Sequence, residues 1–110
     1  EDKASITLTF EDGSFGTIHY LANGGSAFPK ERIEVFCDNA VLQMDNYRVL
    51  TGYGWSGFKR MKLFKQDKGQ RACAKAFIDS IKNGEPSPIP YDEVMESSRV
   101  SIEVANSLHN

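Results

Sequence analysis

Several features that mark catalytic and membrane proteins are missing from this sequence of 110 residues. It has two cysteines and two histidines, scattered without the spacing of a metal site, whereas a catalytic zinc needs three convergent protein ligands. It has no glycine-rich loop that could cradle a phosphate and no nucleophile paired with a base. No uncharged run supplies the roughly 20 apolar residues of a membrane-spanning helix. We therefore expect no metal, no membrane partner and no complete reaction centre in this chain.

The bulk composition is that of an ordinary globular domain. The chain is 40% apolar and 25% charged with a net charge of -2, which gives no general attraction to nucleic acid. This length fits one domain over residues 1–110. Cys37 and Cys73 do not make a disulfide framework, so we expect reduced thiols and a cytoplasmic location. The first residues, Glu1-Asp2-Lys3, lack a Met and suggest a piece of a longer polypeptide.

The first two thirds of the chain show the alternation of β-strands. Ile6, Leu8 and Phe10 alternate with hydroxyl residues, which is typical of an antiparallel sheet with one wet face. Asp12-Gly13 then predicts a tight hairpin turn, because glycine accepts a positive φ. The same reasoning predicts strands over residues 5–10, 15–22, 32–37, 40–44, 47–51 and 58–64.

After Gln66 the apolar residues recur at helical spacing. Asp67, followed by Gln70, has the form of an N-cap with a reciprocal partner, and Asn83-Gly84 suits a helix C-terminus. Between them, Cys73, Phe77 and Ile81 form one apolar stripe.

Prolines 86, 88 and 90 predict an extended connector, after which acidic residues begin a second helix. One face of that helix consists mostly of small residues. The residues on this face are Val94, Ser98, Ser101, Ala105 and Leu108. The order of elements predicts an α+β fold: an open, mostly antiparallel sheet, a meander of about six strands, covered on one face by two C-terminal helices.

The segment from Asn23 to Arg32 is the preferred functional loop, because binding groups concentrate on loops held by rigid strands. Lys30 and Arg32 could clamp a phosphate or carboxylate, and Phe28 could cover a sugar face. The alternative is a solvated turn in which Glu31 and Glu34 neutralise those bases.

Two other segments carry less specific signals. His19 and Tyr20 are adjacent on a strand and point to opposite faces, and His19 lacks a local carboxylate partner, so a surface histidine is favoured. Residues 59–75 are rich in Lys and Arg with aromatic neighbours, which could bind a polyanion. A solvated edge strand is the favoured interpretation, because edge lysines also block aggregation.

Four segments together resemble the Gfo/Idh/MocA oxidoreductase family over nearly the whole chain: residues 6–22 around Asp12-Gly13-Ser14, Arg32-Ile33-Glu34-Val35-Phe36, Gln66-Asp67-Lys68-Gly69 and Ser87-Pro88-Ile89-Pro90. Two further stretches are similar to a bacterial subgroup in which the module follows an alcohol-dehydrogenase-like half, namely Ala27-Phe28-Pro29-Lys30-Glu31-Arg32 and Thr51-Gly52-Tyr53-Gly54.

The resemblance implies that this chain is the distal part of the family's C-terminal α/β domain, without the nucleotide-binding domain. It implies a substrate-binding and oligomerisation segment of an NAD(P)-dependent oxidoreductase acting on a sugar, polyol or nucleotide sugar. The chain alone would then be inactive, with NAD or NADP bound by the parent protein and none in this chain. It would associate as a homo-oligomer through its sheet. No catalytic residue is carried over. The positions nearest a substrate would be Tyr20, Asn23, Phe28, Lys30 and Arg32.

An alternative from another class is a free-standing interaction module that pairs with another protein through the wet face of its sheet. Association that depends on concentration and does not respond to ligand would favour this second function.

Overall fold

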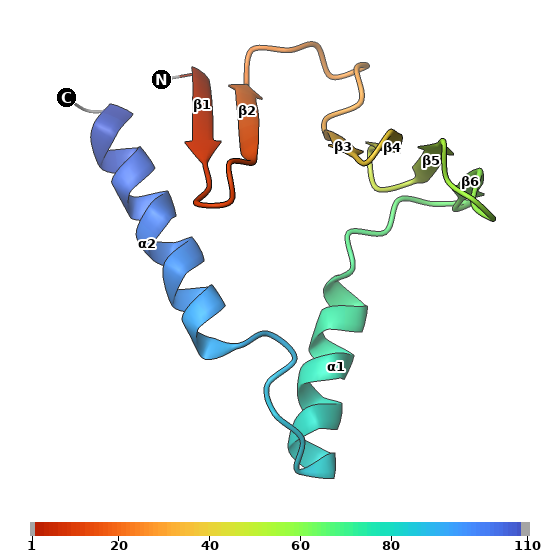
Figure 1. Cartoon of the computed structure of the whole chain (residues 1–110), viewed down its shortest axis with the longest axis vertical. Helices are drawn as coiled ribbons and strands as arrows, with labels where there is room; N and C mark the ends of the chain where they lie inside the picture. Colours follow the sequence, from red (N-terminus) through yellow and green to blue (C-terminus); the bar gives the residue numbers. More distant parts are fainter. Residues whose placement is uncertain (1, 109–110) are drawn as a thin grey trace. The chain divides into compact units, whose positions relative to one another are not determined.

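The computed structural model describes residues 2–108 (Figure 1). In chain order its elements are β1 (Lys3–Thr9), β2 (Phe15–Leu21), β3 (Arg32–Cys37), β4 (Ala40–Asp45), β5 (Val49–Tyr53), β6 (Arg60–Lys62), α1 (Gln70–Asn83) and α2 (Tyr91–Leu108). The predicted α+β class, with its antiparallel strands and two C-terminal helices, is confirmed.

The described strands form two antiparallel sheets and not one continuous meander. β1 pairs with β2, and the second sheet has the order β3-β4-β5-β6. The ladder of the hairpin ends at Leu21, and no strand follows until Arg32. The segment between them contains Gly24, Gly25 and Pro29, which weaken strand pairing or cannot donate a hydrogen bond to it.

Two compact units make up the chain. One comprises Glu1–Gly25 and Ala76–Asn110, and the other is the continuous segment Ser26–Lys75. Helix α1 therefore begins in the second unit and ends in the first. The covering of a sheet face by the helices, and a single domain over residues 1–110, stay predictions.

The β1–β2 hairpin closes as its turn residues predict. Phe10 N donates to Ser14 O at 2.9 Å, and Gly13 has φ +85°. Asp12 Oδ1 accepts hydrogen bonds from Ser14 Oγ at 2.7 Å and from Ser14 N at 2.9 Å. These two bonds favour the carboxylate and hold the pKa of Asp12 below its usual value.

The register of the second sheet separates two chemically different faces. Residues directly opposite one another share a face, so Ile33 and Met44 lie with Leu50 and Met61 across all four strands. Val35 and Leu42 complete this apolar face. The opposite face contains Arg32, Glu34, Phe36, Val41, Gln43, Asp45, Val49, Thr51, Tyr53, Arg60 and Lys62.

Two aromatic residues cover the end of β5 closely. A Cβ added at Gly52 would lie 2.7 Å from Phe58 Cδ1 and 3.1 Å from Trp55 Cδ1. Trp55 is held there because its Nε1 donates to Val41 O at 3.0 Å. Gly54 is similarly enclosed: it has φ +73°, and its added Cβ would lie 2.7 Å from Asn39 O. Gly52 and Gly54 therefore allow close packing at the end of β5.

Helix α1 begins at Gln70, and the prediction of Asp67 as its N-cap is wrong. Gly69 has φ +78°, which is outside the helical region, and its carbonyl accepts the first helical bond, from Cys73 N. Asp67 Oδ1 instead accepts from Gly69 N at 2.8 Å and closes a local turn.

The predicted C-terminus of α1 is confirmed, because the helix ends at Asn83 and the following glycine makes a Schellman cap. Glu85 N donates to Ser80 O, Gly84 N donates to Ile81 O, and Gly84 has φ +65°.

Helix α2 begins directly after Pro90, with Asp92 and Glu93 in its first turn. On its exposed side Arg99 forms ion pairs with Glu96 at 2.6 Å and Glu103 at 2.5 Å. The hydrogen bond from Arg99 lowers the pKa of Glu96, and the same carboxylates raise the pKa of Arg99. Neither described helix combines the length and the apolar character that crossing a lipid bilayer requires.

The described residues contain very little core. Ala40 is the one buried hydrophobic residue among them, and Ser80 is the one buried polar residue. The predicted stripe of α1 is open to solvent, since Phe77 and Ile81 are 54% and 62% exposed. On the sheet, Val35 is 49% exposed.

Candidate functional site

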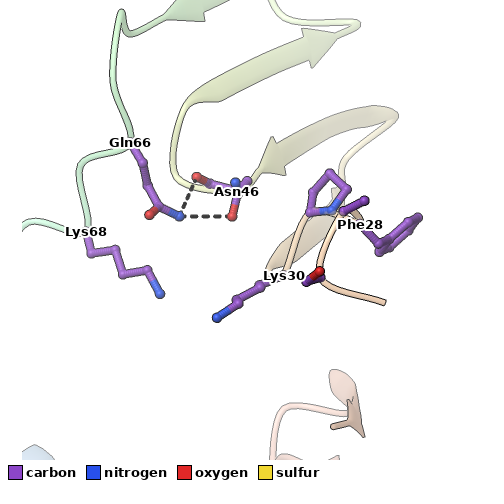
Figure 2. A pocket seen from close by; sticks show the side chains of 8 residues that line it. Phe28, Lys30, Asn46, Gln66 and Lys68 are labelled. Atoms are coloured by element: carbon purple, nitrogen blue, oxygen red, sulfur yellow. Dashed lines mark hydrogen bonds between the residues drawn. The ribbon is translucent and has the colours of Figure 1, made fainter. Parts of the chain in front are cut away.

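A hollow of about 350 Å³ lies within the second unit, where the loop before β3 meets two later segments (Figure 2). One of these is the β4–β5 turn, and the other is the segment that leads from β6 to α1. Its lining residues are Ser26, Ala27, Phe28, Pro29, Lys30, Asn46, Gln66 and Lys68. The functional loop predicted from the sequence thus forms one wall.

The β4–β5 turn supplies the second wall and has positive φ at both of its central residues. Arg48 N donates to Asp45 O at 3.0 Å, and the two residues between them, Asn46 and Tyr47, both have φ 51°. Asn tolerates this left-handed conformation, whereas a bulky residue such as Tyr adopts it rarely. Asn46 N also donates to Glu31 O at 2.7 Å, so the turn is tied to the loop before β3. The β3–β4 turn has the same pair of positive φ values at Asp38 and Asn39, so only the presence of a tyrosine distinguishes the β4–β5 turn.

The segment after β6 is fixed to the same turn by three hydrogen bonds. Gln66 Nε2 donates to Asn46 Oδ1 at 2.9 Å and to Asn46 O at 3.0 Å (Figure 2). Asp67 N donates to Tyr47 O at 3.0 Å. With its amide nitrogen occupied in this way, Gln66 keeps its carbonyl oxygen as an acceptor.

Lys68 is held by an acid and an aromatic ring behind the hollow. Its Nζ forms an ion pair with Glu31 Oε1 and lies 5.7 Å from the centre of the Tyr47 ring, within the range of a cation–π contact. The second oxygen of Glu31, Oε2, is buried and has no hydrogen-bond partner in the described structure. Glu31 therefore positions Lys68 and provides its paired negative charge.

Lys30 supplies the uncompensated positive charge of the hollow. It makes no ion pair among residues 2–108, and its side chain extends to the same open side as that of Lys68 (Figure 2). An anion entering here would meet one free ammonium group and a second one already paired with a carboxylate. Phe28 is 76% exposed at the rim and offers a flat apolar surface.

The structure brings together two of the five residues predicted near a substrate, Phe28 and Lys30. Arg32 does not line the hollow, because its Nε lies 3.1 Å from Glu34 Oε1 and 3.7 Å from Asp45 Oδ1 on the sheet. The alternative interpretation, in which glutamates of the turn neutralise its bases, thus holds for Arg32 but not for Lys30. Tyr20, on β2, and Asn23, after it, belong to the first unit.

Sequence reasoning missed three lining residues, Asn46, Gln66 and Lys68. Asn46 lies between two predicted strands and carries no functional signal in the sequence, and Gln66 and Lys68 occur there only in a basic segment or in a stretch that resembles the family. The register of β3 and β4 is the signal that could have identified Asn46. Because Arg32 pairs with Asp45, the next residues along the two strands, Glu31 and Asn46, must also lie close together.

The hollow has the groups of a binding site and lacks those of a reaction centre. Its lining residues include no nucleophile–base pair and no paired carboxylates. Within residues 2–108 no group of three or more His, Cys, Asp or Glu residues could hold a metal ion. His19 lies on the hairpin, where its Nδ1 and Ser5 Oγ share a hydrogen bond of 3.1 Å. The chemistry available in the hollow is recognition of an anion beside an apolar or sugar-like surface.

Comparisons of the chain with protein-family models, curated proteins and solved structures found no match.

Proposed function

We propose that this chain is the substrate-binding and oligomerisation segment of an NAD(P)-dependent oxidoreductase that acts on a sugar, polyol or nucleotide sugar. The observation that carries the substrate-binding part is the hollow around Lys30. In this hollow the stretch 27–32, which is similar to the bacterial subgroup of the Gfo/Idh/MocA family, lies beside Gln66 and Lys68. These two residues belong to the stretch 66–69, which also resembles the family. Hydride transfer would need the nucleotide-binding domain of the parent protein.

The chemistry of the hollow favours a nucleotide sugar or another anionic sugar within that group. The Lys30 ammonium would pair with a phosphate oxygen, and the Gln66 carbonyl oxygen would accept a hydrogen bond from a hydroxyl group. Phe28 would pack against the flat face of a sugar or base. The fully paired Arg32 takes no part in this arrangement.

A binding experiment on the 110-residue chain tests the proposal. UDP-glucose is titrated into isotope-labelled protein, with UDP and glucose in separate titrations, and amide chemical shifts report the site. We expect saturable shifts centred on Lys30, Asn46 and Gln66. Lys30→Ala should weaken binding about tenfold, because a hydrogen bond to a charged group contributes about 1.5 kcal/mol. Lys59→Ala removes the same charge outside the hollow and is the matched control.

Shifts that spread along residues 59–65 and occur equally with inorganic phosphate would contradict a nucleotide-sugar site and indicate general anion attraction. The chain should also give no NADH or NADPH signal when mixed with UDP-glucose and either oxidised cofactor. Turnover by this chain would refute the proposal that it is inactive alone.

A second candidate function is the free-standing interaction module, and the exposure of apolar residues favours it. Large side chains on both sheets and both helices are open to solvent, among them Ile18, Phe36 and Ile102, at 50%, 73% and 60% exposure. Large apolar side chains that gather in an exposed patch commonly mark a protein interface. Association with no response to any of the three probes would favour this function over the first.

A further inference from the structure

Two asparagines of this chain stand directly before a glycine. One pair is Asn23-Gly24, in the segment after β2, and the other is Asn83-Gly84, at the end of α1. Asparagine is among the thermolabile residues of proteins. Its side chain is most open to attack by the next backbone nitrogen when that nitrogen belongs to glycine, which has no Cβ and adopts many conformations. The two pairs are chemically the same, but the structure gives them different backbone surroundings.

The pair Asn23-Gly24 lies where the β1–β2 hairpin has just ended. The last backbone hydrogen bond of the hairpin joins Ala22 N to Asp2 O at 2.8 Å. Asn23 is in an exposed turn, and Gly24 N makes no hydrogen bond of ordinary geometry in the described part of the chain. No backbone-to-backbone hydrogen bond of the described structure involves residues 23–30. The rotations that bring Gly24 N to the Asn23 side chain are therefore opposed by no backbone bond.

The pair Asn83-Gly84 is held in a fixed backbone. Asn83 is the last residue of α1, so its ψ is confined to the helical range. Gly84 N donates to Ile81 O at 3.3 Å, and Glu85 N donates to Ser80 O at 2.9 Å, as in a Schellman cap. Gly84 N can reach the Asn83 side chain only if this helix end opens. The fold thus protects one of the two pairs.

We infer that Asn23 is a site of spontaneous deamidation in the folded protein, and that Asn83 is protected from the same reaction. The Gly24 amide loses its proton to a base in solution, and its nitrogen attacks Cγ of Asn23 to form a new N–Cγ bond. The bond from Cγ to the side-chain nitrogen breaks, and this nitrogen takes up a proton and leaves as ammonia. The product is a cyclic succinimide.

Water then opens the succinimide ring in one of two ways. Cleavage of the new N–Cγ bond gives an ordinary aspartate. Cleavage of the bond between that nitrogen and the backbone carbonyl carbon gives isoaspartate, in which the chain continues through Cγ. Both products replace a neutral amide with a carboxylate, and isoaspartate also lengthens the backbone. The change falls in the segment that leads from the hairpin to Phe28 and Lys30 of the hollow.

Ageing of the 110-residue chain in neutral and mildly alkaline buffer, followed by peptide mapping with mass spectrometry, tests the inference. At Asn23 we expect the mass gain that replacement of NH2 by OH produces, with both aspartate and isoaspartate as products. The rate should rise with pH, because the nucleophile is the deprotonated nitrogen. Asn83 should react at least about tenfold more slowly, which corresponds to about 1.4 kcal/mol in activation free energy. In guanidinium chloride, which unfolds the helix end, the two rates should become similar.

Gly24→Ala tests the role of the glycine without straining the fold. The φ of Gly24 is not positive, and a Cβ added there would lie 3.8 Å from Leu21 O, an ordinary contact. The added methyl group hinders the attack, so the reaction at Asn23 should slow about tenfold or more. Gly25→Ala is the matched control, since its Cβ would also lie in open space, and it should leave the rate nearly unchanged.

Three results would overturn the inference. One is a folded chain in which Asn23 stays intact, and another is equal reaction at Asn23 and Asn83 before any denaturant is added. The third is a rate at Asn23 that does not respond to Gly24→Ala, because the attacking nitrogen would then not be that of Gly24.

Discussion

The β1–β2 hairpin and the β3–β6 sheet arise from the same alternation of apolar and polar residues but fix their turns differently. In the hairpin, the turn is held by its own residues, Asp12 and Ser14, and Gly13 is surrounded by open space. In the larger sheet, the backbone of the distant β3–β4 turn encloses Gly54, and the rings of Trp55 and Phe58 from the β5–β6 connection enclose Gly52. Local turn chemistry is enough to close a hairpin, whereas the four-stranded sheet also depends on contacts across its strands.

That difference matters for the candidate site. The hollow lies in the unit whose turns are fixed from outside, and its residues Asn46 and Gln66 are 20 positions apart. Sites supported by such cross-strand contacts hold their geometry better than isolated loops. Substitutions at matched glycines of the two sheets can separate what local turn chemistry and what contacts from other turns contribute to stability.

The largest effect is expected from Gly54→Ala compared with Gly13→Ala. Both glycines have positive φ, so each alanine costs roughly 1 kcal/mol in backbone strain. At Gly54 the new Cβ would also lie 2.7 Å from the backbone oxygen of Asn39, which a side-chain rotation cannot relieve. We expect a total loss of about 2–4 kcal/mol at Gly54.

Urea unfolding followed by Trp55 fluorescence measures the Gly54 variant, and hydrogen exchange of the β1 and β2 amides measures the Gly13 variant. Equal losses at the two positions would mean that the close approach to Asn39 contributes nothing.

A smaller effect is expected from Gly52→Ala compared with Gly16→Ala. The added methyl group at Gly52 would require the rings of Phe58 and Trp55 to move, at a cost of about 1–3 kcal/mol. Gly16 has no atom within 4 Å of its Cβ position, so its substitution should stay within about 0.5 kcal/mol.

Thermal unfolding of both variants and the emission of Trp55 measure this difference. The double variant Gly52→Ala, Phe58→Leu should lose less than the sum of its single changes, because the smaller residue relieves the overlap. Full additivity would show that Phe58 does not press on Gly52.

Much of the fold could be predicted because its signals are local. Asp12-Gly13, Asp38-Asn39 and Asn83-Gly84 each mark the turn or helix end at which the structure has a positive φ. The prediction of Asp67 as a cap failed because the same short motif also forms a local turn, and Gly69 decided between them. The sequence predicts six antiparallel strands, and the structure divides them between two sheets, because alternation identifies strands without stating which strands pair.

The candidate site was only half predictable, for a related reason. Phe28 and Lys30 are in one loop whose composition is visible in the sequence. Lys68 reaches the hollow through an ion pair with Glu31, which is 37 positions away. No periodicity connects these two residues, because the contact depends on how β3, β4 and β6 are ordered in the sheet. The positive charge of residues 59–75 is visible in the sequence, but the pairing of Lys68 with Glu31 is not.

The smallest effect is a pH dependence confined to the hairpin. The hydrogen bonds from Ser14 hold the pKa of Asp12 below its usual value in the folded chain. A carboxylate whose folded pKa is depressed contributes stability that is present above its unfolded pKa, about 4, and is lost as the pH falls through the folded value. Below about pH 4, the amide hydrogens of β1 and β2 should therefore exchange faster in comparison with the amide hydrogens of the β3–β6 sheet.

Ser14→Ala should raise the pKa of Asp12 toward its usual value and flatten this pH dependence, as followed by NMR titration of the Asp12 carboxyl group. Ser5→Ala removes a hydroxyl whose hydrogen bond goes to His19 and is the matched control. A pKa of Asp12 that does not respond to Ser14→Ala would show that the Ser14 hydroxyl does not stabilise the carboxylate. The turn would then depend on Gly13, the Phe10–Ser14 bond and the hydrogen bond from Ser14 N to Asp12 Oδ1, which the substitution leaves in place.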